Sequence, residues 1–209
     1  MSGRSSFLKS SVGAKQGMAV SGLILFGFII VHMLGNLTIF AGRDAINAYA
    51  VSLRELPFES LWIGRVVLLA ALVVHVATAF RLARINRAAR PEGYRYRAVI
   101  QTDYAARTML FSGLIILAYV VYHLMHLTFG VTGPGSFELT DPQGRHDVYS
   151  LLVLGFQDGR VAAAYVIANA LLCVHLYHGI QSLFQTLGLS NPKHSTCIRR
   201  LGPAVAVIL

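Results

Sequence analysis

The sequence predicts an all-α membrane protein, a transmembrane helix bundle, from its composition, its long apolar segments and the distribution of its charges. Of the 209 residues, 55% are hydrophobic and only 13% are charged, and the mean hydropathy is +0.59. Soluble domains carry about 25% charged residues, so this chain has roughly half the usual supply. This composition excludes a disordered chain and argues against a soluble enzyme.

Four apolar segments are long enough to cross a bilayer. Each has the roughly 20 residues that a helix needs to span about 30 Å of hydrocarbon. None alternates like a transmembrane β-strand. The linking segments 41–60 and 130–147 are rich in turn residues. The sequence therefore predicts one domain over 1–209, with helices at about 17–40, 61–83, 103–129 and 161–189. The apolar piece at 197–209 resembles the start of a fifth spanning helix, so we expect the natural chain to continue past Leu209.

The charges indicate the orientation of the bundle. If the N-terminus is cytoplasmic, 13 of the 18 Lys and Arg residues lie on the inner side, together with only two of the nine acidic residues. Excess Lys and Arg stays on the cytoplasmic side of membranes, so we expect this orientation. The net charge of +9 then needs no nucleic-acid partner. The basic inner face would bind anionic lipid or an acidic soluble protein.

Several kinds of site lack their ligands in this sequence. The two cysteines, Cys173 and Cys197, form no C-x-x-C pair, so an iron–sulfur cluster, a thiolate zinc site and covalent c-type haem are excluded. The apolar segments contain no Glu, which argues against a di-iron carboxylate site. No dinucleotide-binding or phosphate-binding glycine motif is present.

Histidines are the most informative residues of the predicted helices. An ionisable residue inside a membrane is costly and by default marks a functional site. Counted from the helix ends, one pair lies in the outer half of the membrane and another pair in the inner half. Each pair joins alternate helices, which face each other across a four-helix bundle wound in order, as in bis-histidine ligation of haem iron. The outer pair is His32 with His123, and the inner pair is His75 with His175; His126 and His178 each lie one turn away.

Small residues accompany these histidines. Gly35 follows His32 by about one turn, and Gly179 follows His175. They would let a flat macrocycle approach the helix backbone, although small residues also allow helices to pack closely. A zinc site at the two histidines of the third helix lacks further ligands. Two matched pairs therefore favour two haem groups.

Three stretches resemble one family. The segment GMAVSGLILFGFIIVHMLGNLTIFAGRDAINAYAVSLRELP is similar to the first helix and outer loop of the five-helix, two-haem cytochrome b subunit of succinate:quinone oxidoreductase. Fumarate reductases share this type of subunit. The segments SGLIILAYVVYHLMH and HLYHGIQSLFQTLG resemble the third and fourth helices of the family. The resemblance covers nearly the whole chain.

The resemblance implies four axial ligands to two haem b groups. His32 and His123 would hold the haem that is distal from the cytoplasm, and His75 and His175 would hold the proximal haem.

The resemblance also chooses between neighbouring histidines. In the family the fourth-helix ligand is followed, after three residues, by a Gly, which matches His175 and Gly179 and makes His178 a non-ligand. A Ser-Gly pair precedes the third-helix ligand, which favours His123 over His126.

Other residues are candidate contacts to the haem propionates or to a quinone. Their alternative role is helix-end snorkelling for the arginines and solvated charge for the two acids. The candidates are Arg65 and Arg160 on the outer side, Arg81, Arg84, Arg107, Ser182 and Gln185 on the inner side, the non-ligand histidines His126 and His178, and Glu55 and Glu59 as proton relays to a quinone.

The family divides its reaction among subunits. A flavoprotein oxidises succinate, an iron–sulfur protein passes electrons on, and the membrane subunit delivers them through two b haems to a quinone, usually menaquinone. We therefore expect a membrane-anchor subunit of succinate dehydrogenase in a prokaryotic cytoplasmic membrane. It would bind both partner subunits at its basic face and contain no succinate-oxidising site of its own.

Two other functions stay open at this point. One is the cytochrome b subunit of a formate dehydrogenase or hydrogenase, against which the loop GRDAINAYAVSLRELP argues. The other is a haem-free transporter with a histidine relay.

Overall fold

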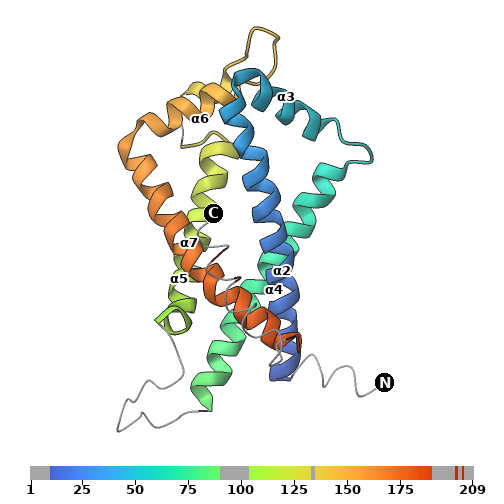
Figure 1. Ribbon diagram of the computed structural model, residues 1–209, viewed down its shortest axis with the longest axis vertical. Helices are drawn as coiled ribbons and strands as arrows, with labels where there is room; N and C mark the ends of the chain where they lie inside the picture. The colour runs from blue at the N-terminus through green and yellow to red at the C-terminus, as the bar shows by residue number, and fades with distance from the viewer. Residues whose placement is uncertain (1–9, 90–103, 133–134, 190–200, 202–203, 205–209) are drawn as a thin grey trace. The chain divides into compact units, whose positions relative to one another are not determined.

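The computed structural model describes residues 10–89, 104–132, 135–189, 201 and 204, and within these ranges the chain is helical and contains no strand (Figure 1). The predicted piece at 197–209 lies almost entirely outside the described residues. The elements in chain order are α2 (Ser11–Asn36), η1 (Leu37–Ala41), α3 (Arg43–Arg54), α4 (Ser60–Ala88), α5 (Tyr104–His123), η2 (Leu124–Thr128), η3 (Gly135–Glu138), α6 (Val148–Gln157) and α7 (Gly159–Thr186).

Four helices are long and apolar enough to cross a membrane, as expected for a multi-pass membrane protein. They are Ser11–Ala41, Ser60–Ala88, Thr108–Thr128 and Gly159–Thr186. The all-helical class and the four long apolar helices are thus confirmed. The ends shift for local reasons. Helix α7 stops before the predicted residue 189 because Gly188 has a φ of +71°, and the Leu189 N–H donates back to the Phe184 carbonyl, as in a glycine-terminated helix end.

The large apolar side chains of these helices face outward. Val31, Val66, Phe111 and Val166 are each more than 60% exposed. The buried positions are instead often small, and include Ala14, Ala19, Ala71 and Ala168. Exposed apolar surface over whole helices is unfavourable in water but matches hydrocarbon, and small buried residues let neighbouring helices approach closely.

The chain forms two compact units, and each long helix contributes to both. The first unit comprises Met1–Gly27, Val66–Gly113 and Cys173–Leu209. The second unit comprises Phe28–Arg65 and Leu114–Leu172, and it also contains the shorter helices α3 and α6.

A buried asparagine joins α3 to the segment before α6 in the second unit. Asn47 is 0% exposed. Its amide nitrogen donates to Asp141 Oδ2 and Asp147 Oδ1, each at 3.1 Å, and its carbonyl oxygen accepts from the Tyr149 N–H at 3.1 Å. Both amide protons and the acceptor oxygen are therefore satisfied.

Two arginines balance the carboxylates bound by Asn47. Arg145 donates from Nε to Asp141 at 2.7 Å and also pairs with Asp44 at 2.7 Å. Arg43 lies 3.7 Å from Asp147. Asp147 also caps α6, because its side chain accepts from the Ser150 N–H at 3.1 Å. Buried carboxylates are tolerated when they are paired and hydrogen-bonded in this way.

We predict that Asn47→Ala destabilises the second unit by about 1–3 kcal/mol, because it leaves two buried carboxylates without their shared donor. Thermal unfolding of the detergent-solubilised protein measures this. The control is Ser52→Ala, also on α3, where an exposed hydroxyl bonds only to the Tyr49 carbonyl. Equal melting temperatures for the two variants would contradict the role given to Asn47.

We also predict that this polar cluster weakens in acid. Burial by itself raises the pKa of the Asp141 carboxyl, but hydrogen bonds from Arg145, Asn47 and Gln143 outweigh it and lower the pKa to about 2. The unfolded value is about 3.9, so the stabilisation is fully present above that pH and is lost as the pH falls through about 2. The melting temperature should fall over this window.

Asp141→Asn removes the titrating group and should flatten this dependence. Glu138→Gln, at an exposed position nearby, should leave it unchanged. A wild-type melting temperature that does not vary between pH 4 and pH 2, a range set by these two pKa values, would contradict the prediction.

Candidate functional site

Two pairs of imidazole rings face each other between long helices. In the second unit, His32 of α2 and the last residue of α5, His123, have ring centroids 5.8 Å apart with an interplanar angle of 89°. In the first unit, His75 of α4 and His175 of α7 have centroids 6.5 Å apart with an angle of 63°. The structure thus brings together the same two pairs that the depth count predicts.

The separation within each pair fits two imidazoles bound to one metal ion. An imidazole nitrogen binds a transition metal at about 2.0 Å and lies about 1.1 Å from its ring centroid, so two opposed ligands have centroids about 6 Å apart. The observed values of 5.8 and 6.5 Å lie on either side of this distance. Each pair is therefore suitably spaced for bis-histidine ligation.

Each site offers only two protein ligands. Within the described part of the chain, no group of three or more His, Cys, Asp or Glu side chains lies close enough to hold a metal ion. A protein zinc site needs three or four such ligands. Two opposed imidazoles suit a metal that brings its own equatorial ligands, as haem iron does.

Each ring of the first-unit pair lies beside a Ser-Gly sequence of a neighbouring helix. Ser21 Oγ lies 3.4 Å from His75 Nδ1, and Ser112 Oγ lies 3.2 Å from His175 Nδ1. A Cβ added at Gly22 would lie 3.3 Å from Cε1 of His75. A Cβ added at Gly113 would lie 3.4 Å from Cε1 of His175. Each serine therefore contacts Nδ1 of one histidine ring, and the glycine next to that serine leaves room for the same ring.

The ring pair of the second unit has a different environment. The Tyr165 hydroxyl of α7 lies 3.4 Å from His123 Nδ1 and 3.0 Å from His126 Nδ1. The Tyr165 hydroxyl therefore bridges the two imidazole rings. His32 instead stacks on Phe28, with centroids 5.2 Å apart and an angle of 21°.

His126 is 1% exposed and lies under α6. A Cβ added at Gly155 of that helix would be 3.1 Å from His126 Nε2. The ring lies in η2, a π-helical turn that follows His123 directly, and such turns occur frequently at functional sites. His126 thus supports the facing pair through Tyr165, a role that neither spacing nor hydropathy indicates.

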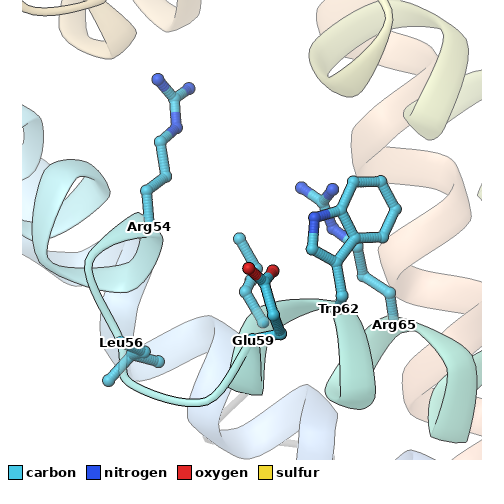
Figure 2. A pocket seen from close by; sticks show the side chains of 6 residues that line it. Arg54, Leu56, Glu59, Trp62 and Arg65 are labelled. Atoms are coloured by element: carbon cyan, nitrogen blue, oxygen red, sulfur yellow. The ribbon is translucent and has the colours of Figure 1, made fainter.

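The remaining candidates lie away from the ring pairs or at helix ends. Arg65 stacks on Trp62, at 4.7 Å from its ring centroid, and both line a pocket of about 250 Å³ with Arg54, Leu56, Glu59 and Leu61 (Figure 2). Arg160 is almost fully exposed and pairs with Asp158 at 2.9 Å.

The other candidates occupy half-buried or exposed positions where their side chains are described. His178 is half-buried one turn after His175, and Arg81 is also half-buried. The side chains of Arg84, Ser182, Gln185 and Glu55 are exposed. Arg107 lies in the first turn of α5, and its side chain is outside the described set.

No family model, no curated protein and no solved structure matches the chain. The resemblance to two-haem cytochrome b subunits therefore stays a prediction, and the functional assignment depends on the two histidine pairs.

We predict that Gly155→Ala destabilises the protein by about 1–3 kcal/mol, the usual cost of overpacking, because the new methyl group meets the buried His126 ring. The matched control is Gly64→Ala in α4, where a Cβ meets nothing within 4 Å and removal of a helical glycine should stabilise. Thermal unfolding of both variants measures the difference. If Gly155→Ala is as stable as Gly64→Ala, His126 is not held as described.

Proposed function

We propose that this chain is a di-haem cytochrome b, the membrane-anchor subunit of a succinate:quinone oxidoreductase. It would connect an iron–sulfur partner on the cytoplasmic side with a quinone in the membrane. The observation that carries the proposal is the presence of two separate imidazole pairs, each at the spacing of two ligands on one ion. The resemblance of the histidine-bearing segments to that family agrees with the proposal.

The chain's residues would divide the work of holding two haems. His75 and His175 would ligate one iron, and His32 and His123 the other. Gly22 beside His75 keeps space open next to the ring. When bound, each haem supplies reversible one-electron exchange.

The partners follow from charge and from missing motifs. The concentration of Lys and Arg at one side of the predicted topology supports a cytoplasmic N-terminus and an acidic protein partner docked there. The sequence has no cysteine cluster and no dinucleotide motif, so the proposal assigns succinate oxidation and iron–sulfur transfer to other subunits. The host membrane would be a prokaryotic cytoplasmic membrane, and the quinone menaquinone.

A quinone contact is proposed at the pocket beside the start of α4. Glu59, Arg65 and Trp62 line it together (Figure 2). A carboxylate can move a proton and an arginine can donate to a quinone oxygen. Aromatic side chains such as Trp62 are common at membrane interfaces.

We predict two haem b groups per chain in protein purified from native membranes, measured as pyridine haemochrome against protein concentration. His75→Ala should retain one haem, His32→Ala should retain the other, and the double variant should retain none. The control His146→Ala, which changes a loop histidine, should keep two.

The same measurement separates the alternatives. A well-folded native preparation without haem would reject the cytochrome and leave the histidine-relay transporter. Haem with a co-purifying formate dehydrogenase or hydrogenase would keep the cytochrome and replace the partner.

A further inference from the structure

The serine and glycine beside each first-unit histidine belong to a repeated pattern. Ser21-Gly22 lies in α2, and Ser112-Gly113 lies in α5. In each helix a histidine of the second-unit pair follows the serine by 11 residues. These histidines are His32 in α2 and His123 in α5. Each serine contacts the histidine of the next long helix along the chain. Helix pairs α2–α4 and α5–α7 therefore carry the same three features in the same order.

The other hydrogen bonds of Ser21 indicate which group donates in its contact with His75. The Ser21 hydroxyl has one proton, and its shortest contact is the Gly17 carbonyl at 2.7 Å. The hydroxyl therefore donates within its own helix and accepts from His75 Nδ1. The His75 ring is thus a donor at this side, which leaves the lone pair on Nε2.

The second serine follows the same logic. The Ser112 hydroxyl donates to the Met109 carbonyl at 3.2 Å and faces His175 Nδ1 at 3.2 Å. Ser112 is 4% exposed and Ser21 is 3% exposed, so water does not compete for either contact. The two Ser112 contacts are equally long, so the repeat of the Ser21 arrangement assigns His175 the same tautomer, with its proton on Nδ1 and its lone pair on Nε2.

We infer that Ser21 and Ser112 are a matched pair of positioning residues, which hold His75 and His175 in the tautomer that presents both Nε2 lone pairs to one haem iron. This inference rests on the proposed function. An acceptor for the Nδ1 proton orients a metal-bound imidazole and makes it a stronger electron donor. A stronger donor favours the oxidised iron, so the two serines lower the midpoint potential of the first-unit haem.

The second-unit haem has no such pair. His123 contacts the Tyr165 hydroxyl, whereas no described residue hydrogen-bonds to the His32 ring, which stacks on Phe28. The serines therefore act on one haem only, and they make the two haems different in potential.

The test is redox potentiometry of the purified complex with optical and electron paramagnetic resonance detection of each haem. Ser112→Ala should raise the potential of the haem bound by His75 and His175 and alter its low-spin signal. It should leave the other haem unchanged. Ser21→Ala should raise the potential of the same haem, because it removes the hydroxyl beside His75 Nδ1. The double variant should shift it most and weaken its binding by about 10- to 100-fold.

Two comparisons distinguish orientation from packing. Ser112→Thr keeps a hydroxyl and should restore the wild-type potential. Thr78→Val removes a hydroxyl that bonds only to the carbonyls of Val74 and His75, and it should move neither haem. A purified wild type without haem rejects the proposed function itself. Two bound haems whose potentials and signals are the same in wild type and both serine variants reject the role of the serines alone.

Discussion

A ring nitrogen placed among apolar helices must find its hydrogen-bond partner inside the protein, because hydrocarbon offers none. This requirement explains much of the arrangement around the facing histidines. Three of the four rings meet a hydroxyl at Nδ1, from Ser21, Ser112 or Tyr165. These hydroxyls contact Nδ1 of each ring and not Nε2. The polar groups therefore stabilise the helices and prepare the paired rings by the same contacts.

The second unit satisfies its polar groups at the helix ends by a different means. Asn47 donates from its amide to Asp141 and Asp147, before α6, and accepts at its carbonyl from Tyr149 in the first turn of α6. Arg145 and Arg43 then neutralise the two carboxylates that the asparagine binds. These contacts join residues about 100 positions apart, so they fix a long connection against α3. Helix α6, held in this way, carries Gly155 to the His126 ring.

The long apolar runs and the depth of each histidine were sufficient to predict the four spans and which rings face each other. The short helices were not predictable in the same way. The apolar stretch 148–157 is half the length of a span, and its helix depends on the Asp147 cap and on burial of Leu151. The roles of Tyr165 and His126 depend on a π-helical turn, which hydropathy does not register. The Ser-Gly repeat can be found in the sequence, but only when the first and third long helices are aligned on His32 and His123.

That alignment has a consequence for the origin of the fold. His32 and His123 occupy the same position in the two helix pairs, and so do His75 and His175. Each facing pair is then one residue meeting its own counterpart, as at the axis of a homodimer. A single ancestral helical hairpin with two histidines, associating with a copy of itself, would already form both facing histidine pairs. Gene duplication and fusion would afterwards let the two halves diverge, giving Tyr165 and His126 to one side of one site only.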